Sequence, residues 1–124
     1  MKMVIDATGV GEGLWSLLDH AYGERKVIPV KFTSKVKSDL GYGFIGLIES
    51  GRYLEYHPFP ETLRLQLENC RSEIMPGPTK VMRWGVPDGT RDRASGDLVH
   101  DDDLITGALC SLLDQLEWYS DCRP

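Results

Sequence analysis

Hydrophobic and polar residues follow two periods along this chain, and the change from one period to the other predicts its strands and helices. Apolar, β-rich runs at Met3–Ala7 and Val27–Phe32 predict buried strands. Each run is followed by a segment with apolar residues three and four positions apart, Leu14–Tyr22 and Lys35–Ser50, and this spacing predicts helices. This alternating order predicts two parallel strands joined by a crossover helix. Glycines that should let the second helix pack closely on a sheet stand at positions 41, 43 and 46.

The second half of the chain predicts one more strand, a helix, an antiparallel hairpin and a long final helix. The hairpin is indicated by two β-rich runs on either side of the Pro-Gly-Pro-Thr loop at residues 76–79. These elements are expected at Arg52–Tyr56, Pro60–Asn69, Arg71–Met75, Lys80–Val86 and Asp102–Trp118. The buried stripe of the last helix is expected at Ile105, Ala108, Leu109, Leu112, Leu113 and Leu116. The pattern predicts a single α/β domain over residues 1–124, with a mixed sheet flanked by helices.

The composition is that of an ordinary globular protein, with 41% hydrophobic and 27% charged residues. No apolar run is long enough to span a bilayer, and Asp6 interrupts the apolar start too early for a signal peptide. We therefore expect a cytoplasmic protein without a membrane segment. The three cysteines, Cys70, Cys110 and Cys122, lack the spacing of a zinc site and predict reduced thiols.

The formal net charge of −5 argues against binding of nucleic acid through overall charge, since such binding relies on lysine and arginine. The charge is unevenly distributed, however. Basic residues gather between Arg25 and Lys37, and the acidic surplus is highest at Asp101–Asp103. A carboxylate-lined site beside basic segments remains compatible with a polyanionic substrate.

Asp6 stands at the end of the first predicted strand, just before a turn that contains Gly9, Gly11 and Gly13. The glycine spacing does not match a dinucleotide-binding loop, and no Gly-Lys-Ser/Thr sequence follows as in a phosphate-binding P-loop. In open α/β sheets, sites form beyond the carboxyl ends of strands, so the Asp6 carboxylate is a candidate site residue. The alternative is that Asp6 only bonds the backbone amides of the turn.

A second acidic cluster, Asp101–Asp103, follows His100 at the start of the last predicted helix. One aspartate could cap this helix and favour the positive end of its dipole. Three adjacent like charges repel one another, a cost that a divalent cation or exposure to solvent can offset. A strand-end aspartate together with helix-start aspartates is the arrangement that two-metal cleavage of phosphodiesters requires.

Three segments in this order resemble the C-terminal nuclease domain of phage-type terminase large subunits, the motors that package viral DNA. They are VIDATGVGEGLWSLL at 4–18, VIPVKFTSKVKSDLGYGFIGLIESGRY at 27–53 and HDDDLITGALCSLL at 100–113. The resemblance implies an RNase H-like fold and a Mg²⁺- or Mn²⁺-dependent endonuclease that cuts concatemeric double-stranded DNA. The implied partners are DNA, the terminase ATPase domain, the small subunit and the portal, in the cytoplasm of a bacterial host.

The resemblance also assigns roles to individual residues. Asp6 matches the second catalytic acid of the family, and the third acid falls in the run after His100, where Asp103 is favoured over Asp102. The implied catalytic and metal-binding residues are Asp6, Asp102 and Asp103, with His100, Asp101 and Lys35 as auxiliary residues. For Lys35 and His100, a solvated lysine and a partly exposed histidine are the alternative interpretations.

One departure from the family leaves enzymatic activity open. The family's first catalytic aspartate lies on a strand upstream of the VIDATGVG motif, and this chain begins at that motif. We therefore expect an N-terminally truncated domain: either a fragment of a longer nuclease or an inactive relative that serves as an assembly or interaction module. The missing strand would expose a sheet edge, which favours pairing with a second copy. A small-molecule-binding domain that uses the glycine turn is the third alternative.

Overall fold

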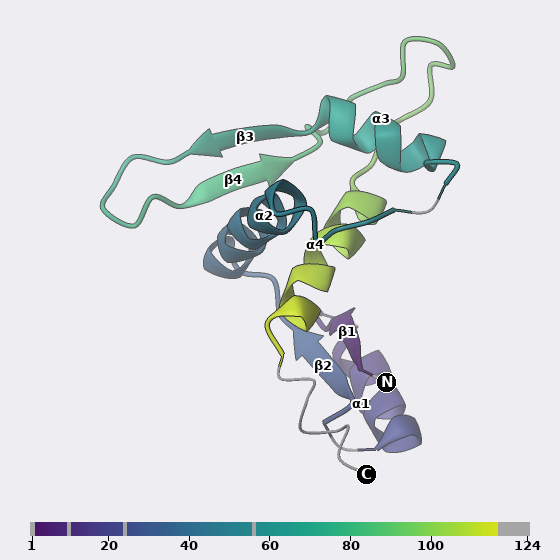
Figure 1. Cartoon of the computed structure of the whole chain (residues 1–124), viewed down its shortest axis with the longest axis vertical. Helices are drawn as coiled ribbons and strands as arrows, with labels where there is room; N and C mark the ends of the chain where they lie inside the picture. The colour runs from purple at the N-terminus through teal and green to yellow at the C-terminus, as the bar shows by residue number, and fades with distance from the viewer. Residues whose placement is uncertain (1, 10, 24, 56, 117–124) are drawn as a thin grey trace.

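The computed structural model describes residues 2–9, 11–23, 25–55 and 57–116, and over these residues the chain forms four helices and two small sheets (Figure 1). In chain order the elements are β1 Met3–Asp6, α1 Gly11–Tyr22, β2 Val27–Val30, α2 Ser34–Glu49, α3 Glu61–Asn69, β3 Arg71–Ile74, β4 Met82–Gly85 and α4 Asp102–Asp114. The predicted mixed α/β class is confirmed. No helix in these ranges combines the length and the apolar character needed to cross a membrane.

The first sheet consists of β1 and β2, which run parallel with Met3 opposite Val27 and Asp6 opposite Val30. Helix α1 connects the two strands and packs against both of them, as the alternating pattern predicts (Figure 1). Pro29 in β2 has no N–H to donate and is exposed, in a strand that pairs on one side only within the described residues.

Helix α2 begins and ends where its sequence predicts. The Thr33 hydroxyl accepts a hydrogen bond from the Val36 N–H at 3.1 Å and so caps the first turn. After the helix, Gly51 adopts a φ of +72°, a conformation that glycine tolerates without strain.

The hydrophobic core lies where α2 and α4 pack against each other and against β2. The buried residues that form it are Val30, Leu40, Phe44, Leu104, Ala108 and Leu109. The predicted stripe of α4 is correct for Ala108 and Leu109, whereas Leu104 was not predicted and is only 2% exposed. Since α4 contacts α2, α3 and β1, its buried face is wider than one stripe. Trp118, the predicted end of this helix, lies outside the described residues.

The second sheet is the hairpin of β3 and β4, antiparallel with Arg71 opposite Gly85 and Ile74 opposite Met82. It packs on α2, where the Ser38 hydroxyl accepts a hydrogen bond from the Met82 N–H at 2.9 Å. Close approach is possible because Gly41 has no side chain: a Cβ there would lie 2.5 Å from both Met82 Cε and the Trp84 indole nitrogen. The predicted glycine packing is confirmed at this position.

Two predictions about the sheets are wrong. Residues 52–55 form no strand, because the N–H groups of Arg52 and Tyr53 both donate to the Leu47 carbonyl at the end of α2; Tyr56 lies outside the described residues. The hairpin and the parallel pair also form separate sheets in the described part of the chain, not one mixed sheet. Figure 1 shows the reason: the hairpin covers α2 at one end of the molecule, and α4 runs from there to β1 and β2.

The close contact at Gly41 gives a testable prediction. Gly41→Ala should destabilise the protein by about 1–3 kcal/mol, because the new methyl group would push Met82 and Trp84 away from α2. Gly46→Ala is the matched control in the same helix, since no atom of the described residues outside the helix's own backbone lies within 4 Å of its Cβ position. Alanine there should leave stability unchanged or raise it by up to about 1 kcal/mol. Urea unfolding measures both, and equal effects of the two substitutions would contradict the packing described.

Candidate functional site

A cleft of about 530 Å³ brings residues from both ends of the chain together. It lies between the end of β1, the start of α2 and the start of α4. The residues that line it are Val4, Asp6, Phe32, Lys37, Asp101, Asp102, Ile105, Thr106 and Leu109. Three carboxylates and one ammonium group therefore share this cleft.

Asp6 is the last residue of β1 and is exposed. Its Oδ1 accepts a hydrogen bond from the Thr8 N–H at 2.9 Å, which is the turn contact expected of a strand-end aspartate. The same side chain lines the cleft, so the two alternatives for Asp6 are not exclusive. The Thr8 hydroxyl in turn accepts from the Phe32 N–H at 2.9 Å. These bonds tie the loop after β1 to the segment that follows β2 and orient the Asp6 carboxylate at the end of β1.

Asp101 is the N-cap residue of α4, but its side chain makes no capping hydrogen bond. Its carboxylate lies against the backbone of Gly85, where a Cβ would be 2.7 Å from Asp101 Oδ2. Gly85 also has a φ of +140°, so two separate features require glycine there. The end of the hairpin thus forms one wall for the Asp101 carboxylate.

The three consecutive aspartates do not all line the same cavities. Asp102 lines the cleft together with Asp6 and Asp101, and it also lines a cavity of about 400 Å³ that includes Asp103. Asp103 does not line the cleft: its Oδ2 accepts a hydrogen bond from the Gln66 amide at 3.2 Å, and it lines two cavities on the side of α3. Successive helical residues point in directions about 100° apart, so neighbouring carboxylates on α4 face different surroundings. The structure therefore brings Asp101 and Asp102 to Asp6, and not Asp103, which the sequence favoured.

Two of the three auxiliary residues, His100 and Lys35, lie outside the cleft, whereas Asp101 lines it. His100 is exposed and lines a cavity of about 400 Å³ that also includes Asp103. The Lys35 side chain is 85% exposed, and its ammonium pairs with Asp39 at 3.2 Å one turn later on α2. This is the solvated lysine of the alternative interpretation.

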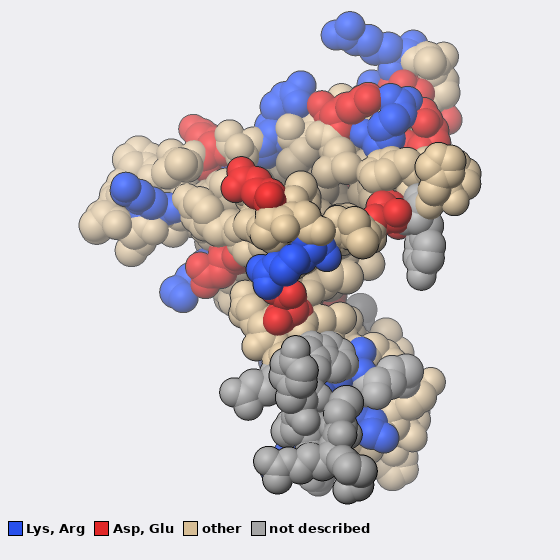
Figure 2. All heavy atoms as spheres, in the orientation of Figure 1, with Lys and Arg blue, Asp and Glu red and all other residues tan. Residues whose placement is uncertain are grey.

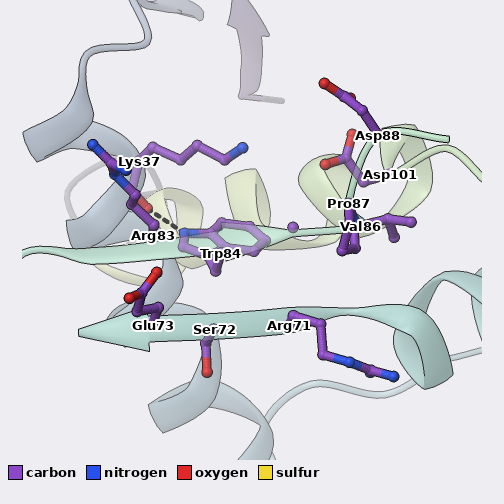
Figure 3. A pocket seen from close by; sticks show the side chains of 11 residues that line it. Lys37, Arg71, Ser72, Glu73, Arg83, Trp84, Val86, Pro87, Asp88 and Asp101 are labelled. Atoms are coloured by element: carbon purple, nitrogen blue, oxygen red, sulfur yellow. Dashed lines mark hydrogen bonds between the residues drawn. The ribbon is translucent and has the colours of Figure 1, made fainter. Parts of the chain in front are cut away.

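Lys37 is the cation of the cleft, although the sequence pattern did not indicate it as a site residue. Lys37 stands one helical turn before Gly41, on the face of α2 that packs on the hairpin. Its spacing from Gly41 is the feature of the sequence that could have placed it near the hairpin. Its carbonyl accepts a hydrogen bond from the Trp84 indole N–H at 2.6 Å. Figure 3 shows its side chain running alongside the Trp84 ring toward Asp101, with the ammonium 5.5 Å from the ring centroid. That distance allows a cation–π attraction that orients the ammonium.

A second cavity of about 400 Å³ adjoins the cleft along the hairpin, and the two share Lys37 and Asp101. Its charged lining residues balance in sign: Lys37, Arg71 and Arg83 against Glu73, Asp88 and Asp101. In Figure 3 the Arg71 side chain points away from Trp84 and Lys37. Figure 2 shows the same mixture over the visible face, where acidic and basic side chains are interspersed.

The carboxylates of the cleft fit a hydrated ion better than a closed metal cage. Within the described ranges, no three His, Cys, Asp or Glu side chains group closely enough to hold a metal ion by themselves. Mg²⁺ is usually bound through one or two carboxylates, with water and substrate phosphate as the other ligands. Asp6, Asp101 and Asp102 are the carboxylates that line the cleft and are available to supply such ligands.

On the side of α4 that faces α3, a cavity of about 440 Å³ contains Tyr53, Glu55 and Cys110 besides Asp103. The Tyr53 hydroxyl donates to Glu55 Oε2 at 2.8 Å. Burial, with the neighbouring Glu55 carboxylate, raises the pKa of Tyr53 to about 12. Burial also raises the pKa of the Cys110 thiol, which favours the unreactive protonated form.

Comparisons with protein-family models, with curated proteins and with solved structures found no match to this chain. The functional interpretation therefore depends on the geometry and chemistry of the cleft.

The contact between Gly85 and Asp101 can be tested directly. Gly85→Ala should destabilise the protein by about 2 kcal/mol or more, from the unfavourable φ and from crowding against the carboxylate. Asp101→Ala removes the crowding but not the backbone strain. In the Gly85→Ala background it should therefore restore part of the lost stability in urea unfolding. No restoration would show that the Asp101 carboxylate does not lie against Gly85.

Tyr53 gives a prediction on pH dependence. The folded chain disfavours the phenolate, so the stability that Tyr53 contributes is complete below its ordinary pKa of 10 and is lost as pH rises toward about 12. Tyr53→Phe should therefore lose less stability than the native protein between pH 10 and pH 12. Tyr22→Phe, at an exposed tyrosine, is the control. Equal alkaline losses in native protein and Tyr53→Phe would contradict the burial of this hydroxyl.

Proposed function

We propose that this chain is an RNase H-like, metal-dependent nuclease domain of the kind found in phage-type terminase large subunits, cutting double-stranded DNA during genome packaging. One observation carries the proposal. Asp6 at the end of β1 and Asp101 and Asp102 at the start of α4 lie far apart in the sequence and line the same cleft. The parallel pair β1–β2, its crossover helix and the packing of α4 on β1 support the fold assignment.

In this proposal the carboxylates of Asp6, Asp101 and Asp102 hold hydrated Mg²⁺ or Mn²⁺, directly or through bound water, with substrate phosphate as a further ligand. The bound ions would activate a water molecule and stabilise the leaving oxygen of the phosphodiester. Asp103 is left out of the ligand set because its carboxylate accepts a hydrogen bond from Gln66 on the side of α4 that faces α3. The Thr8 N–H fixes one oxygen of the Asp6 carboxylate, which keeps that side chain oriented toward the cleft.

Lys37 is assigned to the substrate phosphate. It lies beside carboxylates in the cleft, and its side chain is oriented by Trp84. An ammonium group in this position can bind a phosphate oxygen at the point where the nucleic acid reaches the carboxylates. The adjoining hairpin cavity, with Arg83 on β4, extends the surface available to a DNA strand.

A second candidate function is an assembly or interaction module without nuclease activity. It is favoured by the small size of the first sheet: within the described residues β1 and β2 pair only with each other, and their outer edges are open to another strand. Under this hypothesis the partner is a second copy or another terminase component, the ATPase domain, small subunit or portal. Both candidates place the protein in the cytoplasm of a bacterial host.

Plasmid nicking in the presence of Mn²⁺ tests the nuclease. The native chain should convert supercoiled plasmid to the open circle, and chelation of the metal should abolish this. Asp6→Asn and Asp102→Asn should each reduce the rate by about 100-fold or more, because each removes a metal ligand.

Asp103→Asn is the matched control, since it neutralises the adjacent aspartate without touching the cleft. It should retain most of the activity and should bind Mn²⁺ like the native chain in calorimetry. A folded native chain that binds no Mn²⁺ and does not nick DNA would reject the nuclease and favour the interaction module. A loss of activity in Asp103→Asn as large as in Asp102→Asn would contradict the ligand set.

A further inference from the structure

The start of α4 is capped by a side chain from another helix. The Leu104 N–H donates to Gln66 Oε1 at 2.9 Å, and the Gln66 amide nitrogen donates to Asp103 Oδ2 at 3.2 Å. Gln66 belongs to α3 and is only 7% exposed. Both polar ends of this buried side chain are therefore used at the first turn of α4.

This arrangement replaces the usual role of the N-cap residue. An aspartate at the N-cap normally accepts a hydrogen bond from the N–H two or three residues into the helix, and Leu104 is at the third position after Asp101. Here the Leu104 N–H donates to the Gln66 side chain instead. The ψ of Asp101 is 18°, outside the extended region typical of N-cap residues, and its carboxylate lies against Gly85 and lines the cleft.

We infer that Gln66 is a positioning residue: it caps α4 in place of Asp101 and thereby leaves the Asp101 carboxylate in the cleft with Asp6. The capping role stands on the hydrogen bonds alone. The consequence for metal binding rests on the proposed function. The same side chain holds Asp103 on the side of α4 that faces α3, so one glutamine determines the positions of two of the three aspartates.

Gln66→Leu removes the acceptor and leaves a buried N–H at Leu104. Asp101 can supply a new acceptor by rotating to the extended conformation of a normal N-cap. A double-mutant cycle with Asp101→Ala detects this exchange. Asp101→Ala should raise the equilibrium constant for unfolding at least about fivefold more in the Gln66→Leu background than in the native background.

Gln66→Glu is the matched control, because it keeps an oxygen for the Leu104 N–H and removes the donor to Asp103. In that background Asp101→Ala should cost no more stability than in the native chain, because the side chain at position 66 still accepts from the Leu104 N–H. Equal effects of Asp101→Ala in the native and Gln66→Leu backgrounds would overturn the inference. If Gln66→Leu does not fold, hydrogen exchange at the Leu104 amide decides. Asp101→Ala alone should leave its protection unchanged, and loss of protection would show that Asp101 is the cap.

Mn²⁺ calorimetry separates this inference from the proposed function. If both hold, Gln66→Leu should weaken Mn²⁺ binding about as much as Asp101→Asn does, and Gln66→Glu should weaken it less. Absence of Mn²⁺ binding by the native chain would contradict the proposed function, and the cycle would still decide the role of Gln66. An additive cycle in a chain that binds Mn²⁺ would overturn the role of Gln66 and leave the proposed function standing.

Discussion

The packing of α4 against α2 is the contact on which the rest of the structure depends. The hairpin rests on α2, and β1 rests on α4, so the two small sheets are joined mainly through the apolar contact between these helices. Phe44 and Ala108 are among the buried residues at this contact. A two-stranded sheet is not stable by itself, so both sheets need this helical layer. The position of α4 relative to β1 also decides which of its first residues can reach Asp6.

The cleft follows from how the start of α4 is held on three sides. Gln66 from α3 provides the cap, Gly85 at the end of β4 leaves room for Asp101, and Lys37 on α2 lies nearby, oriented by Trp84. Each contact comes from a different element, so the arrangement of charges is a property of the tertiary structure. This explains how three consecutive aspartates can have different surroundings: two line the cleft together with Asp6, and one bonds to a buried amide.

Local patterns predicted most of the elements, because β1, α1, β2, α2, α3 and the hairpin are each marked by periodicity or by turn residues. The failures concern contacts between elements. Arg52 and Tyr53 belong to a segment with the composition of a strand, but their backbone N–H groups donate to the Leu47 carbonyl near the end of α2. Asp6 could be proposed as a site residue from its place at a strand end. Which aspartates of α4 face Asp6 depends on how that helix is rotated about its axis, and local sequence patterns do not show this. Gln66 looks like any polar residue of an exposed helix, and no local signal marks its burial.

The central claim is that Asp6 and the first residues of α4 face one divalent ion. Paramagnetic broadening by Mn²⁺ in amide NMR spectra measures this most directly, because it reports the distance of each amide from the ion. Substoichiometric Mn²⁺ should broaden the amides of Asp6 and Thr8 together with those of Asp101 and Asp102. Broadening confined to one of these segments, or spread over exposed acidic residues such as Glu61, would contradict the account.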